Sequence, residues 1–315
     1  MKILIWCDIE GISGIDDPDT GFNDENYKHL ATAEINAVIK GLKKGRVTEI
    51  DIFDGHGMGN NLILEDLDVS ANYLGGGWMY TLADLIRSEK LKSYNAMVLI
   101  GLHAQEGVKN GFIAHTNSGF TALRLNGKPI GEIQQAIWLL GYFGIPTLLV
   151  SGDEAAVNET KHYFSDIATV SVKKKEKNKF VCFPLKEIYT QLEEKSFEKI
   201  SNLENITIHN LSGPINVEIL YSFSKLADNM IIFPGYEKKD ERTVIYKAKD
   251  YLEAFWAYHG FHIVLTDVMK EFCNRILQRV EKEFELKENE KYEKIRKNVY
   301  DELLEEKIQF PELEF

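Results

Sequence analysis

The sequence predicts an α/β fold: a largely parallel sheet with helices on both faces, a smaller C-terminal α+β portion and a charged C-terminal helix. Strand-like apolar runs alternate with helical patterns up to about residue 170, and this rhythm changes beyond about residue 200. Regular alternation of strands and helices favours βαβ units, in which helices cover both faces of a parallel sheet.

Four short apolar runs are the expected strands of the sheet, and helical patterns separate them. Within residues 30–42 and 133–140, apolar side chains recur mostly at steps of three and four, which is the helical period. The pair Asp153-Glu154 is typical of the acidic first turn of a further helix. The expected strands are residues 2–7, 48–53, 95–101 and 146–151.

The second half of the chain has a different pattern. A helix is expected at 251–259, and the strongly charged residues 266–315 are expected to form a helical tail. Three strand-like segments come before these helices, at 205–209, 214–221 and 242–247. We therefore divide the chain into an α/β domain at 1–200, a smaller α+β portion at 201–265 and a tail at 266–315.

The composition is that of a globular protein. Hydrophobic residues make up 44% and charged residues 27% of the 315 positions, which excludes disordered and fibrous classes. A net charge of −12 argues against a nucleic-acid partner, because nucleic acids are bound by basic faces. The lysine cluster that begins at Lys173 is short and is interrupted by Glu176, so we expect a solvated turn there.

The sequence favours a cytoplasmic location. No apolar run approaches the ~18 residues of a transmembrane helix, so no membrane partner is expected. The first residues are typical of a β-strand, since they contain an early acid and no small-residue cleavage site. The cysteines are scattered and odd in number, which argues against disulfides and favours a reducing compartment. They are Cys7, Cys182 and Cys273.

Polar side chains near glycines follow three of the expected strands. Asp8 and Glu10 come after the first strand, where period-two alternation turns both to the same side. His56 follows the second strand and His103 the third, while Glu132 opens a helix further along the chain. In open α/β sheets, ligands bind beyond the carboxyl ends of the strands. We therefore expect these five side chains to line one binding site.

Taken singly, each of these residues has a structural explanation. Strand-end acids often cap helices or form turns, and a single histidine after a strand is usually structural. Glu132 alone would be an ordinary first-turn acid that interacts with the helix dipole. Capping does not readily explain why three successive strands deliver ligand-type residues to one edge of a sheet.

The residue types favour a site with two metal ions. Two histidines and three carboxylates, without cysteine, suit Zn²⁺, with Mn²⁺ and Co²⁺ as alternatives. Five ligands exceed what one tetrahedral ion needs when it also binds water, and they suit two ions about 3.5–4 Å apart that share a carboxylate. Asp8 is the central acid and the natural bridge, whereas Cys7 is expected to point into the core.

With this set of motifs, the sequence resembles the zinc-dependent D-aminopeptidases of the dipeptide-transport-operon type. The similarity covers residues 1 to about 260. The family signature Ser-x-Asp-x-Glu-Gly matches at Asp8, Glu10 and Gly11, but Trp6 replaces its serine, where it either reshapes the pocket or packs beneath it. The other motifs are Asp54-Gly55-His56-Gly57, Gly101-Leu102-His103-Ala104, Ala114-His115-Thr116, Gly131-Glu132 and Val150-Ser151-Gly152-Asp153.

The resemblance implies an enzyme that removes N-terminal D-residues from short peptides, using water activated by two zinc ions. It implies that Asp8, Glu10 and His56 hold one ion. The second ion would be held by Asp8 together with His103 and Glu132.

The resemblance also assigns a role to His115 and an assembly to the chain. The family's catalytic histidine corresponds to His115, which lies in the glycine-rich loop 111–119. There it is placed to donate to an oxyanion or to protonate the leaving amine, and a plain surface loop is the structural alternative. The family implies a closed homo-oligomer, a decameric ring with its active sites facing an internal channel. Apolar positions near Phe255 and Trp256 are compatible with a subunit contact.

Three other functions are compatible with the same residues. The first is a two-metal phosphoesterase, which would need cations for its phosphate, and only Lys109, Arg124 and Lys128 lie near the motifs. The second is an L-aminopeptidase or another amidase on the same metal scaffold. The third is a metal-binding assembly protein without catalytic activity.

Overall fold

The computed structural model describes residues 1–20, 25–259 and 312–313, and the chain divides into two compact units. The first unit comprises Met1–His115, Ile130–Leu211 and the C-terminal segment from Glu312. The second comprises Thr116–Pro129 and, among the described residues, the chain from Ser212 to His259. Residues 116–129, which the sequence analysis placed in the first domain, thus join the second unit. They do so because β5 (Thr121–Leu125) pairs with β10 (Ile215–Tyr221).

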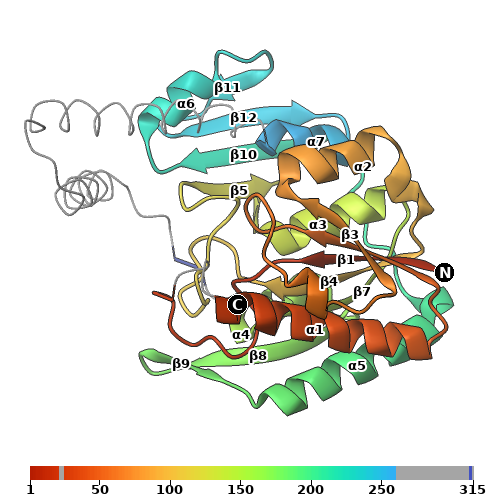
Figure 1. Cartoon of the computed structure of the whole chain (residues 1–315). Coiled ribbons are helices and arrows are strands. Elements are labelled where there is room, and N and C mark those ends of the chain that lie inside the picture. Colours follow the sequence, from red (N-terminus) through yellow and green to blue (C-terminus); the bar gives the residue numbers. More distant parts are fainter. Residues whose placement is uncertain (21–24, 260–311, 314–315) are drawn as a thin grey trace, which may run out of the picture. The chain divides into compact units, whose positions relative to one another are not determined.

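The first unit is built on a seven-stranded sheet that is parallel except at one edge (Figure 1). Only the last strand, β9, runs antiparallel to its neighbour. The largely parallel sheet predicted from the sequence is therefore confirmed. In spatial order the strands are β3 (Ala71–Gly76), β2 (Glu49–Asp54), β1 (Lys2–Cys7), β4 (Ala96–Leu102), β7 (Thr147–Asp153), β8 (Ala168–Glu176) and β9 (Lys179–Cys182).

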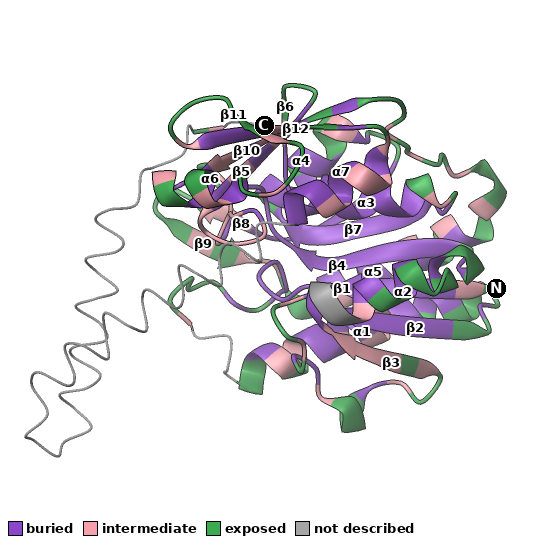
Figure 2. Ribbon diagram, turned by 90° about the horizontal axis from the view of Figure 1, so that it is seen from above, coloured by how far each residue is buried: buried purple, intermediate pink, exposed green. Residues whose placement is uncertain are grey.

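Helices cover both faces of this sheet, as predicted. Helices α1 (Glu25–Lys44) and α5 (Leu185–Ser201) lie side by side on one face. Helices α3 (Glu132–Tyr142) and α4 (Glu154–Tyr163) lie on the other (Figure 2). The shorter helical segments are Leu64–Asp66, a π-helical turn at Gly77–Leu82, α2 (Ala83–Arg87), Lys90–Ser93 and Leu203–Asn205.

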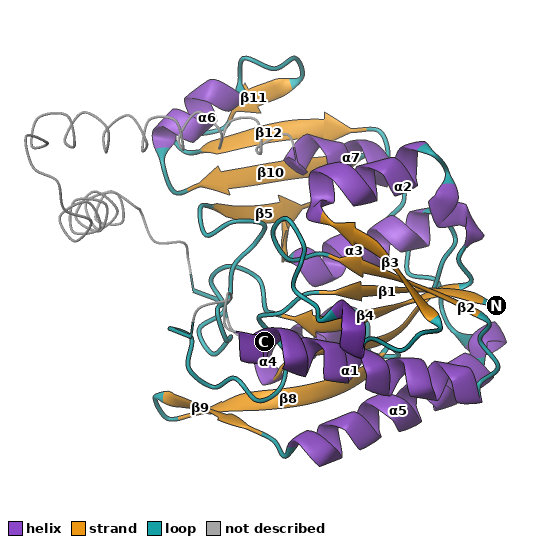
Figure 3. Cartoon of the chain, in the orientation of Figure 1, coloured by secondary structure: helices purple, strands orange, loops and turns teal. Residues whose placement is uncertain are grey.

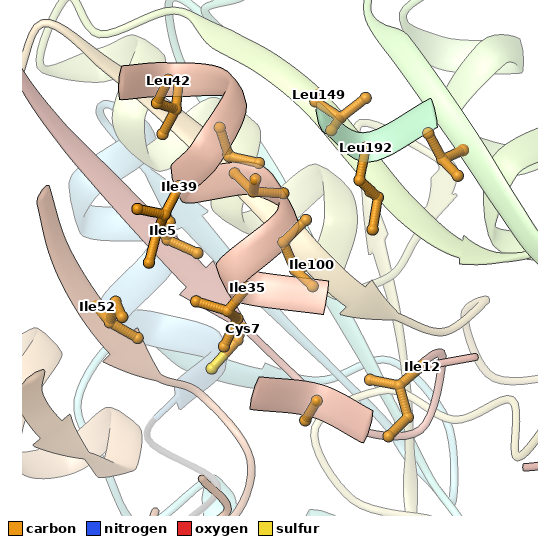
Figure 4. Close-up of a cluster of buried hydrophobic side chains, with 14 of the residues drawn as sticks. Ile5, Cys7, Ile12, Ile35, Ile39, Leu42, Ile52, Ile100, Leu149 and Leu192 are labelled. Atoms are coloured by element: carbon orange, nitrogen blue, oxygen red, sulfur yellow. The ribbon is translucent and has the colours of Figure 1, made fainter. Parts of the chain in front are cut away.

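The core beneath α1 follows from the alternation of side chains along β1. Ile3, Ile5 and Cys7 point towards α1 and are completely buried, so the expected core position of Cys7 is confirmed. They pack with aliphatic side chains from the helix, such as Ile35 and Ile39 (Figure 4). Burial of this apolar surface fixes the register of β1 and therefore the direction in which Asp8 and Glu10 leave its end.

The second unit is organised around a five-stranded sheet in the order β11-β12-β10-β5-β6 (Figure 3). Strand β10 pairs antiparallel with β5 and β12. The strands and helix predicted at 214–221, 242–247 and 251–259 are confirmed. The remaining elements are β6 (Lys128–Ile130), α6 (Ser224–Met230), β11 (Tyr236–Lys238), β12 (Thr243–Ala248) and α7 (Tyr251–His259).

Two local predictions are wrong. Residues 205–209 do not form a strand, because Ile208 is 46% exposed and no neighbouring strand pairs with the segment among the described residues. The lysine cluster at Lys173 is not a solvated turn, since it continues β8, and Lys173 itself is completely buried. A buried run through Val170 and Val172 extends that strand into the lysines.

No helix in the described parts of the chain is long and apolar enough to cross a membrane. The predicted helix in the tail lies outside the described residues.

Candidate metal centre

The predicted site residues meet where the strand order of the large sheet reverses. From β1 the chain builds outwards through β2 and β3, and then returns to place β4 on the other side of β1. The carboxyl ends of neighbouring strands on the two sides of such a switch point leave room for a ligand. Asp8 follows β1 and His103 follows β4, so both lie at this position.

Two glycines allow the chain segments after β1 and β4 to approach each other. The backbone N–H of Gly11 donates to Gly101 O at 2.8 Å. A Cβ on Gly11 would lie 1.9 Å from Leu102 O, and one on Gly101 would lie 2.2 Å from Asp8 O. Gly101 also has φ +74, a backbone conformation that residues with a side chain rarely adopt. These contacts bring Asp8 and His103 to one site.

The first group of ligand-type side chains consists of Asp8, Glu10 and His56. The imidazole Nδ1 of His56 lies 3.2 Å from Asp8 Oδ1 and 3.0 Å from Glu10 Oε2. Both carboxylates are almost completely buried. Their convergence on one imidazole nitrogen confirms that Asp8 and Glu10 point to the same side of the chain.

The second group consists of Asp8, His103 and Glu132. His103 Nε2 lies 3.7 Å from Asp8 Oδ2 and 3.4 Å from Glu132 Oε1. Its other ring nitrogen, Nδ1, lies 3.0 Å from Ala104 O and donates to it, because a carbonyl can only accept. The free nitrogen Nε2 therefore faces the carboxylates. Asp8 belongs to both groups, as expected of a bridging ligand.

His115 lies beside the second group. Its ring stacks on that of His103, with centroids 3.9 Å apart and an angle of 13° between the planes. His115 Nδ1 donates to Ile113 O at 2.8 Å, so Nε2 faces the acids, 3.7 Å from Glu132 Oε1 and 4.0 Å from Glu10 Oε1. All six predicted side chains are thus gathered in one cluster. The same geometry also makes His115 a possible ligand together with Glu10 and His103.

The charges of the cluster are strongly coupled. Burial by itself would lower the pKa of His56, but its hydrogen bonds to Asp8 and Glu10 raise that pKa to about 10. Burial is likewise outweighed at His103, where Glu132 raises the pKa well above its ordinary value. Burial and the adjacent Asp8 raise the pKa of Glu10. The acids therefore attract positive charge to this position.

The residues fit divalent metal ions. Ligands that bind one Zn²⁺ tetrahedrally at about 2.0–2.2 Å are roughly 3.3–3.6 Å apart, which is close to the separations of His103 Nε2 from the two carboxylates. His103 Nε2 is buried and has no hydrogen-bond partner among the described residues. A metal ion held here would supply the partner that a buried imidazole nitrogen needs, because burial without a partner is costly.

Two further buried acids, which were not predicted to belong to the site, hold the segments next to the clustered side chains. Asp54 accepts hydrogen bonds from the backbone and side chain of Asn61, whose amide also donates to His56 O at 2.9 Å. Glu159 accepts the Gln105 N–H at 2.8 Å, and burial raises its pKa to about 7. Glu159 could have been recognised in the sequence as an acid on the face of α4 that is otherwise buried.

Trp6, which replaces the signature serine, is a buried residue of β1. The side chain is 1% exposed, and its ring contacts that of Phe53 edge-on at 5.0 Å. Trp6 is therefore part of the buried core next to the strand end that carries Asp8.

This arrangement defines a class of protein. A parallel α/β sheet with carboxylates and imidazoles gathered at its switch point is typical of metal-dependent α/β hydrolases. A family model described as D-aminopeptidase matches residues 1–259. The chain therefore belongs to the D-aminopeptidase family, and the resemblance deduced from the motifs is confirmed.

Individual relatives agree with this assignment. The chain is 28% identical over 287 residues to a D-aminopeptidase of Bacillus subtilis, and the match covers 87% of this chain and 100% of that protein. It is also similar in structure to the Zn-dependent D-aminopeptidase DppA from Bacillus subtilis, a self-compartmentalizing protease. That similarity has a TM-score of 0.74 at 25% identity and covers 83% of this chain and 97% of the other.

Proposed function

We propose that this protein is a zinc-dependent aminopeptidase that removes the N-terminal residue of short peptides, with a preference for D-residues. The observation that carries the proposal is the cluster of two ligand groups that share Asp8. One zinc ion would be held by Asp8, Glu10 and His56, and the other by Asp8, His103 and Glu132. Mn²⁺ and Co²⁺ suit the same donor set. The D-preference comes from the relatives.

The proposed chemistry is amide hydrolysis. Zinc bound at these residues would supply a Lewis acid that activates water and polarises the peptide carbonyl. Glu10 and Glu132 face His115 Nε2 from about 4 Å, which keeps that nitrogen directed at the cluster. From there it would hold a proton for the oxyanion or for the leaving amine.

The proposal also includes the oligomeric state of the protein and the compartment in which it works. DppA is a self-compartmentalizing protease, and we propose that this chain likewise forms a closed homo-oligomer, with a decameric ring as the specific form. The described cysteines Cys7 and Cys182 are free thiols, which is compatible with a reducing cytoplasm.

A parallel assay tests this function against its alternatives. Zinc-loaded protein would be given D-Ala-p-nitroanilide, L-Ala-p-nitroanilide and a phosphate monoester, each with and without a chelator. We expect chelator-sensitive hydrolysis of the anilides, with the D-substrate preferred. Faster L-anilide cleavage would indicate an L-aminopeptidase, and cleavage of the phosphate ester alone would indicate a phosphoesterase. Metal binding without any turnover would favour an assembly protein.

The phosphoesterase has less support at the level of the residues. Lys109, one of three cations near the motifs, is exposed and pairs with Glu312 at 3.4 Å. The cluster itself consists of acids and imidazoles.

A further inference from the structure

A completely buried lysine lies behind the metal centre. Lys173, on β8, has 0% exposure, although lysine is almost never fully buried unless it is paired. Removing an ammonium group from water carries a large desolvation penalty, so its position needs compensating contacts. Those contacts connect Lys173 to the candidate metal centre.

Lys173 contacts two chain segments that contribute residues to the metal centre. Its Nζ donates to the backbone oxygen of Glu10 at 3.1 Å, and Glu10 is one of the proposed ligands. The same Nζ lies 3.6 Å from the centroid of the Phe112 ring, which is a close cation–π contact. Phe112 precedes His115 by three positions in the loop after β4.

The backbone of Phe112 is held as well. Its N–H donates to Asp153 Oδ2 at 3.1 Å, and the same carboxylate oxygen caps α4 by accepting from Ala155 N at 3.3 Å. Phe112 is therefore fixed by its amide at Asp153 and by its ring at Lys173. The ammonium group joins the turn that carries Glu10 to the loop that carries His115.

We propose that Lys173 is a positioning residue that fixes Glu10 and the His115 loop relative to each other. This inference rests on the proposed metal-binding role of Glu10. The ammonium acts through the Glu10 carbonyl and the Phe112 ring, and it does not itself bind metal or substrate. Residues that orient metal ligands in this way typically change metal affinity or activity by 10- to 100-fold when they are replaced.

The alternative role is purely structural. Lys173 also interacts electrostatically with the buried acids Glu34 and Asp153, so it could serve only to balance their charge. A charge-balancing role predicts lower thermal stability on replacement, with unchanged zinc affinity in the folded molecules.

The test uses Lys173→Met, because methionine has a side chain of similar length but carries neither a hydrogen-bond donor nor a charge. Lys174→Met is the matched control, because Lys174 is the next residue of β8, is partly exposed and pairs with Glu176. Zinc affinity would be measured by competition with a chelator, together with the melting temperature of the metal-free protein and kcat. We expect zinc affinity to fall about 10- to 100-fold in Lys173→Met and to stay at the wild-type value in Lys174→Met.

Lys173→Arg, which retains the cation and its donors, should recover part of the lost affinity. Equal zinc affinity and kcat in Lys173→Met and Lys174→Met would refute the proposal while leaving the metal site intact. Failure of the wild-type protein to bind zinc would refute the metal site and, with it, this proposal.

If Lys173→Met does not fold, Phe112→Leu becomes the deciding variant. Leucine keeps an apolar side chain in the core but removes the ring face that the ammonium contacts. A several-fold loss of zinc affinity would support the proposal, and wild-type affinity would refute it.

Discussion

Asp8 is the residue on which both proposed metal sites depend. Its two carboxylate oxygens face different imidazoles, with Oδ1 towards His56 and Oδ2 towards His103. We expect Asp8→Ala to lose both zinc ions, whereas His56→Ala should weaken mainly one. Elemental analysis of the purified variants measures this directly. One tightly bound ion in the wild type, unchanged in Asp8→Ala, would contradict the two-site assignment.

His115 is expected to serve the reaction rather than the fold. Because its Nε2 faces the acids while Nδ1 is fixed by Ile113 O, His115→Ala should reduce kcat by about 10²–10⁴-fold. Zinc content and melting temperature should change little. Steady-state kinetics with metal analysis of the same sample provides the measurement. Loss of zinc together with the imidazole would show that His115 is a ligand.

The raised pKa of His56 predicts that zinc binding releases protons. In the metal-free protein its pKa is about 10, so the imidazole is protonated near neutral pH and must lose that proton to bind zinc. Apparent zinc affinity should therefore rise with pH until it passes this pKa, and fall as pH is lowered. Calorimetric titration in buffers of different ionisation enthalpy reports the protons released. Binding enthalpies that do not depend on the buffer would contradict this expectation.

At the residue scale, the sequence indicated the clustered acids and imidazoles but not the residues that support them. Asp8, Glu10 and His103 could be identified because acids and imidazoles beside glycines at strand ends are chemically distinctive. Lys173 could not, because a run of lysines normally indicates a solvated segment. Its burial depends on contacts with Glu10 and Phe112, which are remote in sequence.

At the element scale, the site depends on the close approach of the segments after β1 and β4. Gly101→Ala should lower the free energy of unfolding by about 2–5 kcal/mol, since the new Cβ would meet Asp8 O and the backbone is left-handed there. Zinc affinity should fall as well, because Asp8 and His103 would move apart. Chemical denaturation and chelator competition measure the two effects.

Gly144→Ala is the control for this substitution. Gly144 has φ +80, but nothing lies within 4 Å of a Cβ built there. It should therefore cost only the backbone strain, about 1–2 kcal/mol, and leave zinc affinity unchanged. Equal effects of the two substitutions would contradict the argument from close approach.

The strands with the clearest sequence signal are those buried on both faces. Strands β1, β4 and β7 are continuous apolar runs, so their existence and order of appearance were clear. Strand β3 was not predicted, because Ala71–Gly76 is half-buried and ends in glycines. The pairing of β5 with β10 is remote in sequence and has no local signal.

At the scale of the whole molecule, we expect a homo-oligomer. Part of the apolar stretch that suggested an interface is already used within the second unit, since Phe255 is buried there and contacts Tyr258 and His259. The predicted helical tail lies outside the described residues, and the expectation therefore depends on the self-compartmentalizing relative. Light scattering at micromolar concentration should give a mass several times 36.1 kDa. A monomer with full peptidase activity would contradict it.

The central claim is that the cluster around Asp8 forms a two-zinc peptidase centre. A titration of metal-free protein with zinc, in which hydrolysis of the dipeptide D-Ala-D-Ala is followed at each addition, tests this claim most directly. The rate should rise with added zinc and reach its plateau at about two equivalents per chain. A plateau at about one equivalent, or hydrolysis that does not depend on zinc, would contradict it.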